Sequence, residues 1–496
     1  MWLILLTSLT GILGGSPPPA VHSSIDPSVS LVVVYVDFPD GRLPDGSLPS
    51  LDADSSRVEN IDAVGSMGWV PSENPSTSGE YRKKIRKYTY EDYWDPVFSV
   101  GEYRGPLHPD YGSHQAYQPS KEEDKRQERY NLEVFGSVRD YWREVSDGKF
   151  DIVPFQTHPG RNDKYHTGIV NNVLMDSSGR RFIRWIQLPY PKAAYNFGPT
   201  GYDRDAMPDA LTILDSLHNR TAESDPNHLD FDIRSYDAAN QKVGFITAGG
   251  RLGGWATLGG KYFIIPEKMQ YFQNTDPASL FNPITEFAHE FGHTLGIPHQ
   301  AVGPYDIMHW GGLALRRNYF CPPHINPKLK MELGWISPGD VIVVDSDRVV
   351  ALPPIDRSPR VAQIMMRPRR GTRMTGSGEC LIVEYRLREG FNRYCGGLDT
   401  AFHGGALIWH VLVGGEIPFA SNDDVRRNLG LEVRNYGDAF KGSPGSPADF
   451  FYERNPTLDG STNPGTNSID GTATGISLSN FTTSPDSLRF VVRYER

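Results

Sequence analysis

The sequence predicts an α+β fold, with a mixed helix-and-strand domain over residues 21–337 and a β-rich C-terminal domain over residues 338–496. Two patterns support this prediction. Before residue 338, β-branched runs alternate with stretches whose apolar residues recur at helical spacing. After residue 338, short strand-like runs such as CLIVEYRL and GALIWHVLV are separated by Gly, Pro, Asn and Asp. The change of pattern marks the boundary between the two domains.

The mixed domain is expected to open on a buried strand. The β-branched run from Leu31 to Gly41 ends in a Pro-Asp-Gly turn. Residues 42–128 are rich in Pro, Ser, Gly and charge and predict a loop-rich insertion, whose basic run at 83–87 is interpreted as a solvated helix face. Further elements follow in chain order: a helix over 130–146, a strand over 149–155, a helix over 206–218, and strands over 242–247 and 262–265.

Two more helices are expected to begin at an Asn-Pro pair, at Asn282-Pro283 and at Asn326-Pro327. Asn caps the first N–H groups of a helix, and Pro suits the first helical position. The first of these helices should end at Gly296, because glycine readily takes the left-handed conformation that closes a helix. The second and shorter helix should end at Gly334.

The formal net charge of −10 over 496 residues argues against a nucleic-acid partner, which would call for a basic face. Residues 2–15 are apolar and precede SPPPA, which favours a signal peptide over residues 1–20 and a secreted protein. A disordered apolar start on a cytosolic protein is the alternative. Because no other run approaches the ~18 apolar residues of a membrane span, none is expected in the mature chain. Sequons at Asn219 and Asn480 are compatible with a glycoprotein.

The three cysteines, Cys321, Cys380 and Cys395, are too few for a disulfide framework. Their odd number leaves at least one thiol unpaired within the chain. Cys380 and Cys395 are spaced so that they could bridge a loop, but spacing alone does not establish the bond. None of the three has the CxxC spacing of a metal site.

The most specific pattern is HEFGHTLGIPH, from His289 to His299. On a helix with about 100° per residue, His289 and His293 lie one turn apart on the same face. The opposite side carries an apolar stripe that should face the core: Ile284, Phe287, Ala288, Phe291 and Leu295. Gly296 lets the chain reverse, so that His299 can approach the same point. Three neutral imidazoles and an open fourth position are typical of a catalytic zinc site, and we therefore predict bound Zn²⁺.

Glu290 lies between the two helical ligands and should point toward the fourth position, where a water molecule would bind. Zinc lowers the pKa of such a water to about 7, so Glu290 can act as general base and later pass the proton to the leaving amine. HExxH alone is a weak signal, but the added glycine and third histidine make a chance match rare. A satisfied core histidine is the alternative for any single residue, although His289 and His293 both lie off the apolar stripe.

Other nearby residues carry weaker predictions. Met308, nine residues after His299, matches the methionine turn beneath the metal of HExxHxxGxxH enzymes, with ordinary core packing as the alternative. Glu286 falls on the ligand face, where it either orients a ligand imidazole or, as the simpler interpretation, remains a solvated carboxylate. Three neighbours are candidates for stabilising an oxyanion: Tyr305, His309 and Trp310. Four further histidines lack a partner at ligand spacing and are expected to be structural or exposed: His158, His166, His403 and His410.

With these motifs in view, the chain resembles the immune inhibitor A type of zinc metallopeptidase over roughly residues 30–495, with poor matching in 42–128. The matching segments include VVVYVDFPD, SVRDYWREVSDGKFDI, TEFAHEFGHTLGIPH, YDIMHWGG, KLKMELGWISPGDV, ECLIVEYRLREGF, GGALIWHV and GISLSNFTTSPDSLRFVV. The resemblance implies a zincin-like catalytic domain with an active-site helix and an extracellular, zinc-dependent endopeptidase activity. It also implies zinc ligands at His289, His293 and His299 and the catalytic acid/base at Glu290.

Three features depart from that family's pattern. Many members have Asp at the third ligand position, where this chain has His299, the choice of metzincins. The stretch comparable to the family's calcium-like loop, Asp230 to Gln241, has too few acidic residues in register to predict structural Ca²⁺. A long propeptide is not expected, because the first predicted strand follows soon after the leader.

The predicted function is that of a secreted zinc-dependent endopeptidase that hydrolyses peptide bonds in proteins through a zinc-activated water. One alternative is a non-catalytic extracellular binding or adhesion protein that retains the zincin fold, which an intact Glu290 disfavours. The other is a zinc amidase acting on a non-protein substrate. The expected partner is a protein or peptide substrate; the sequence predicts neither its identity nor the oligomeric state.

Overall fold

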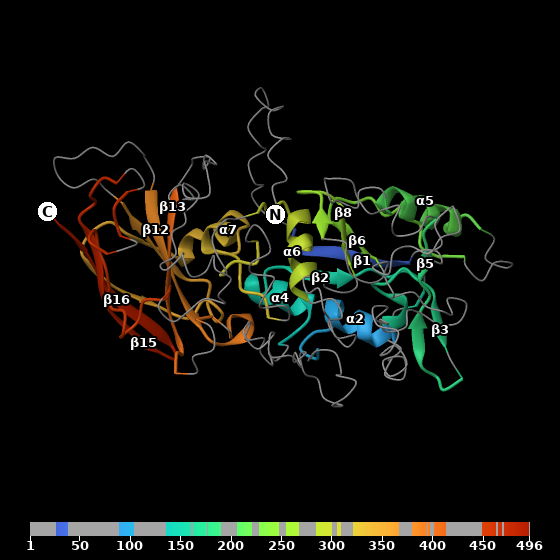
Figure 1. The fold of residues 1–496 in the computed structure, drawn as a ribbon, viewed down its shortest axis with the longest axis horizontal. Helices are drawn as coiled ribbons and strands as arrows, with labels where there is room; N and C mark the ends of the chain where they lie inside the picture. The colour runs from blue at the N-terminus through green and yellow to red at the C-terminus, as the bar shows by residue number, and fades with distance from the viewer. Residues whose placement is uncertain are drawn as a thin grey trace, which may run out of the picture. The chain divides into compact units, whose positions relative to one another are not determined.

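The computed structural model describes residues 26–37, 89–103, 135–158, 160–161, 163–175, 177–189, 206–220, 228–247, 254–266, 284–299, 305–308, 321–366, 379–393, 395–396, 401–412, 449–462, 465–468 and 471–495. The chain forms two compact units (Figure 1). Within the described part, the first unit comprises Asp26–Asp140 and Asp151–Ile297, and the second comprises Tyr141–Phe150 and the residues from Pro298 onward. Mixed α and β structure, several sheets and a β-rich C-terminal region agree with the predicted class.

A six-stranded sheet forms the centre of the first unit, in the order β2-β1-β6-β8-β7 with β5 beside β1. Neighbouring strands are parallel except for β7 and β8, which are antiparallel. The run from Leu31 to Val36 in β1 is buried throughout, as expected of a strand covered on both faces. The strands are β1 (Ser28–Asp37), β2 (Asp151–Pro154), β5 (Ile186–Gln187), β6 (Gln241–Thr247), β7 (Trp255–Ala256) and β8 (Tyr262–Pro266).

The helix α6 (Ile284–Thr294) packs against β8 of this sheet through aromatic rings (Figure 1). The ring of Phe263 lies 5.0 Å from that of Phe287 and 6.1 Å from that of Phe291. The other α-helices in the described residues before 297 are α2 (Tyr90–Phe98), α4 (Val138–Val145) and α5 (Ala206–His218), and β3 (Val173–Met175) pairs antiparallel with β4 (Arg181–Ile183). The helix α6 therefore lies beside β8 and beside β7, which is the last described strand on this side of the sheet.

Most of the elements predicted before residue 338 are present. The helix α5 has the predicted bounds, and strands β1, β2, β6 and β8 lie where strands were expected. Gly296 has a φ of 87° after the end of α6, as predicted. The helix α7 (Pro327–Glu332) follows Asn326, whose side chain accepts the N–H of Leu329 at 3.0 Å. The predicted cap at Asn282-Pro283 lies outside the described residues.

The predicted start of the helix over 130–146 is wrong for the part that can be compared. Phe135 to Ser137 are not helical, and α4 begins at Val138. Ser137 and Asp140 explain this start, because the Ser137 hydroxyl accepts the N–H of Asp140 at 3.0 Å and the Asp140 carboxylate accepts the N–H of Ser137 at 3.1 Å. Such reciprocal bonds fix the first turn of a helix.

The predicted loop-rich insertion contains a helix, α2, that the sequence analysis missed. The Asp92 carboxylate accepts the N–H of Thr89 at 2.7 Å and caps its first turn. Pro96 lies inside this short helix, and a proline argues against a helix when only the sequence is available. The basic run at 83–87 and the predicted signal peptide lie outside the described residues.

Two four-stranded sheets form the β-rich part of the second unit, in the orders β13-β12-β11-β9 and β10-β16-β15-β14 (Figure 1). A common apolar core joins them, in which Val383 and Tyr385 of β12 pack with Phe490 of β16. Cys380 and Ile382, on the other face of β12, belong to a second core. The strands are β9 (Val341–Val344), β10 (Arg348–Leu352), β11 (Val361–Met365), β12 (Glu379–Leu387), β13 (Gly404–Leu412), β14 (Thr457–Leu458), β15 (Ile476–Ser484) and β16 (Ser487–Tyr494).

The cysteines Cys321, Cys380 and Cys395 are each buried and unbonded, so the disulfide that spacing left open between the last two is not formed. Both predicted sequon asparagines, Asn219 and Asn480, are exposed. Among the described helices, none combines the length and the apolar character needed to cross a bilayer.

Candidate metal centre

The helix α6 carries the predicted site and is buried on every side. Four residues of the predicted apolar stripe are buried, and Leu295 is half-buried. The opposite side, expected to be more polar, is buried too: His289, Glu290 and His293 are only 2%, 7% and 7% exposed. A helix with polar groups buried around it needs partners or ligands for those groups, because burying an unsatisfied polar group is costly.

The three predicted ligands come together in the structure. His289, His293 and His299 each offer one ring nitrogen, and these nitrogens all lie within 4.8 Å of one another. The rings of His289 and His293 are nearly perpendicular, at 87°, with centroids 4.8 Å apart. His299 is exposed, whereas the two helical histidines are buried. This group could hold a metal ion.

The helix end fixes the tautomer of His293. Its Nδ1 donates to the carbonyl oxygen of Ile297 at 2.7 Å, which leaves the ring's lone pair on Nε2. The reversal that places this carbonyl depends on Gly296, whose N–H binds the His293 carbonyl at 2.9 Å while Ile297 donates to Gly292 at 3.2 Å. Burial lowers the pKa of His293 below its ordinary value, and the bond to the Ile297 carbonyl only partly offsets this. A neutral imidazole oriented by a backbone carbonyl is the usual form of a metal ligand.

The three ring nitrogens lie close enough together to share one metal ion. Two ligand nitrogens about 2.1 Å from a tetrahedral zinc ion lie about 3.4 Å apart. The three nitrogens of this site all lie within 4.8 Å of one another. Three imidazoles also provide the nitrogen donors that zinc prefers.

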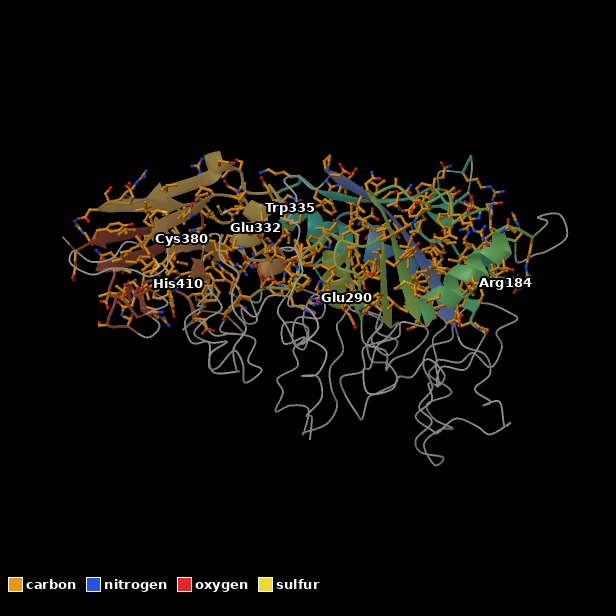
Figure 2. The ribbon with its side chains drawn as sticks, turned by 90° about the horizontal axis from the view of Figure 1, so that it is seen from above. Arg184, Glu290, Glu332, Trp335, Cys380 and His410 are labelled. Carbon is orange, nitrogen blue, oxygen red and sulfur yellow. The ribbon has the colours of Figure 1, made fainter. Side chains whose placement is uncertain are left out.

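Glu290, which Figure 2 marks on α6, lies between the helical histidines in sequence and is buried. Burial raises the pKa of this carboxyl well above its ordinary value, and the nearby charge of Glu286 raises it further. A bound cation would act in the opposite direction and favour the carboxylate.

Glu286 is buried, contrary to the simpler expectation that it is a solvated carboxylate. It is only 5% exposed, and its Oε1 accepts the N–H of Gly254 at 3.0 Å. The solvated interpretation is therefore wrong, because α6 is covered on both sides. Gly254 immediately precedes strand β7, a connection that sequence spacing could not indicate.

Met308 lies in a tight turn with no exposed surface. Asp306 holds this turn, because its carboxylate accepts the N–H of Met308 at 2.7 Å and the N–H of Asn326 at 2.9 Å. The hydroxyl of Tyr305 donates to Asp449, which gives this predicted oxyanion candidate a structural partner. The other two candidates, His309 and Trp310, lie outside the described residues.

The remaining histidines named from the sequence are structural or exposed, as predicted. His410 on β13, which Figure 2 labels, pairs with the buried Glu379 at 2.8 Å. His158 lies 3.8 Å from Asp230 and edge-on to His166, with ring centroids 4.8 Å apart. His403 is exposed.

A second cluster, in the second unit, was not predicted. Ligand atoms of Glu144, His324 and Asp356 lie within 4.8 Å of one another. The Nε2 of His324 is 2.9 Å from Glu144 and 3.5 Å from Asp356. These residues are far apart in sequence, so no spacing motif could reveal them.

Lys330 makes this second cluster an ion network rather than a metal centre. Its Nζ is 2.9 Å from Nδ1 of His324, so the lysine donates to the ring and the Nε2–H faces the carboxylates. A metal-bound histidine instead donates its second N–H to an acceptor, which an ammonium group cannot be. The positive charge of Lys330 lowers the pKa of Glu144 and of Asp356 and so opposes part of the effect of their burial.

Comparisons of this chain with protein-family models and with curated proteins gave no match. The assignment of the site therefore rests on its own residues and their geometry.

Proposed function

We propose that the protein is a secreted zinc-dependent endopeptidase of the immune inhibitor A type, with a zincin-like catalytic domain. The observation that carries this proposal is the group formed by His289, His293 and His299, with Glu290 between the two helical ligands. The methionine turn at Met308 and the β-rich C-terminal region accompany this motif in the resemblance set out above.

The three histidines would hold the zinc ion through their ring nitrogens. When bound, zinc supplies a Lewis acid that polarises the scissile carbonyl and lowers the pKa of a water molecule to about 7. The hydrogen bond from His293 to Ile297 keeps one ligand ring in the required tautomer and orientation.

Glu290 would carry the proton. It accepts a proton from the attacking water as the new C–O bond forms at the scissile carbonyl. It then gives that proton to the amine nitrogen as the C–N bond breaks, so the reaction needs no other co-reactant. Its burial keeps this carboxyl away from bulk water, which strengthens its electrostatic interactions with the reacting groups.

The strand β7 suits the recognition of an extended peptide. It pairs antiparallel with β8 and ends the described strand order of the sheet, close to α6. A peptide that adds to a sheet edge gains main-chain hydrogen bonds that do not depend on its side chains. This favours a protein substrate over a non-protein amide.

The direct test is hydrolysis of casein by the purified full-length protein, with and without a zinc chelator. We expect cleavage to stop with the chelator and to return when zinc is added back. Cleavage that persists after the zinc has been removed would contradict a zinc mechanism. Bound zinc without cleavage of casein or of a peptide library would instead favour the non-catalytic binding protein.

A further inference from the structure

Glu286 is a buried carboxyl that the proposed proton transfer does not use. It is 5% exposed, and burial raises its pKa to about 7. A carboxyl that serves only to keep a helix soluble would face water, so its burial calls for a structural or functional reason. Its Oε1 accepts a hydrogen bond from the N–H of Gly254 at 3.0 Å.

Gly254 in turn lies directly against Glu290. A Cβ atom placed on Gly254 would be 2.6 Å from Oε1 and 2.7 Å from Cγ of Glu290. A side chain at Gly254 would therefore require the buried Glu290 side chain to move. The Glu290 side chain thus packs directly against the backbone at Gly254.

The segment that begins at Gly254 is attached to α6 at two points. Glu286 binds its first residue, and the N–H of Gly259 donates to the carbonyl of His293 at 2.8 Å. Between these points, Trp255 pairs with Ile264 of β8. The position of the Gly254 backbone relative to α6 is therefore set by its bond to Glu286 and by the bond from Gly259 to the helix backbone.

We propose that Glu286 is a positioning residue, which holds the Gly254 backbone against Glu290 and so fixes the location of the Glu290 carboxylate. This inference rests on the proposed role of Glu290 in peptide hydrolysis. Glu286 itself touches neither substrate nor reacting atoms in this account. Glu286 acts through Gly254: its hydrogen bond holds the Gly254 backbone in place, and the absence of a side chain on Gly254 lets that backbone lie against Glu290.

Three variants of the full-length protein separate this role from a merely structural one. Glu286→Ala removes the acceptor, Glu286→Gln keeps an oxygen acceptor for Gly254, and Gly254→Ala pushes a methyl group into Glu290. Glu332→Ala is the matched control, because it removes a helix carboxylate that pairs with Lys328 in α7. The readouts are zinc content, kcat and KM on a peptide, and hydrogen exchange of the peptide segment that contains the Gly254 amide.

We expect Glu286→Ala to retain zinc, to exchange the Gly254 amide faster, and to lose about 10- to 100-fold in kcat with little change in KM. Glu286→Gln should recover most of that kcat and the slow exchange. Gly254→Ala should lose kcat to a similar extent with zinc retained, and Glu332→Ala should match the unmodified protein.

Wild-type kcat in Glu286→Ala, or equal impairment of Glu286→Ala and Glu286→Gln, would overturn the inference. If Glu286→Ala does not fold, the pair Glu286→Gln and Gly254→Ala decides: an impaired Gln variant or a fully active Gly254→Ala contradicts it. The exchange measurement does not depend on turnover. A failed peptidase assay of the unmodified protein would therefore reject the proposed function without being mistaken for a failure of the Glu286–Gly254 bond.

Discussion

The Nδ1–H of His293 donates to the carbonyl oxygen of Ile297 at 2.7 Å. The bond joins the last turn of α6 to the backbone that follows it, and it settles which ring nitrogen is available as a metal ligand. It forms because Gly296 reverses the chain with a φ of 87°. The glycine that ends the helix therefore also orients a ligand.

Replacing Gly296 tests this link. Gly296→Ala places a Cβ in open space but on a left-handed backbone, so the cost is conformational, at about 1–2 kcal/mol. We expect the free energy of unfolding, measured with urea on the metal-free protein, to fall by that amount and the zinc affinity to fall as well. Gly339→Ala is the control, because Gly339 has ordinary backbone angles and space for a methyl group. Equal stability of the two variants would contradict the role of Gly296.

Removing a ligand should remove the metal. His293→Ala is expected to lose the zinc equivalent and with it the stabilisation that zinc gives to the folded state, because two ligands cannot complete the site. Zinc content by elemental analysis and the melting temperature with and without chelator measure both effects. His403→Ala, which changes an exposed histidine, should retain zinc and its melting response. A full zinc equivalent in His293→Ala would argue against this ligand set.

A buried ion pair stabilises the second unit. Arg386 donates through Nε to Glu384 at 2.9 Å and through Nη1 to the carbonyl of Tyr305 at 2.7 Å, with neither charged side chain exposed. Arg386→Leu leaves Glu384 uncompensated and should cost about 3–5 kcal/mol in chemical denaturation. The double variant Arg386→Leu/Glu384→Leu should be more stable than Arg386→Leu alone. If the single and the double variant lose the same free energy of unfolding, the cost does not come from an uncompensated Glu384.

The second cluster predicts a pH dependence of stability. Burial, and next the charge of Asp356, raise the pKa of Glu144 from 4.5 to about 8. At pH values between 4.5 and about 8, Glu144 therefore keeps its proton in the folded protein but has lost it in the unfolded chain. Because the folded state binds more protons, the free energy of unfolding falls as the pH rises.

Glu144→Gln tests that dependence. The amide keeps an oxygen acceptor for the N–H of Phe391 and for His324 but cannot ionise. Urea unfolding between pH 5 and 8 should therefore show a smaller loss of stability in the variant than in the unmodified protein. The control Glu332→Gln, in the partly exposed pair with Lys328, should keep the original slope. Identical slopes in all three proteins would contradict the buried-proton interpretation.

Local patterns predicted much of the fold, and the two helices for which the prediction was wrong also have local causes. Gly296 and Asn326 act within one turn of their own helix, so their roles could be predicted from neighbouring residues alone. The helix α4 starts later than predicted because the reciprocal bonds between Ser137 and Asp140 fix its first turn inside a longer apolar pattern. The helix α2 was hidden by Pro96.

In the site, by contrast, long-range packing accounts for what the sequence did not predict. The three histidines lie in one short stretch, so their spacing revealed them. Glu286 was interpreted as solvated because a helix pattern does not show what covers its polar side; here the backbone at Gly254 does. The cluster of Glu144, His324 and Asp356 forms only when three distant segments fold together.

The most direct test of the central claim is the variant Glu290→Ala, assayed for zinc content and for cleavage of casein. Because Glu290 carries the proton and is not a ligand in this account, the variant should bind a full equivalent of zinc and lose about 10²- to 10⁴-fold in turnover. Full cleavage by Glu290→Ala, or loss of its zinc together with its activity, would contradict the assignment of the general base.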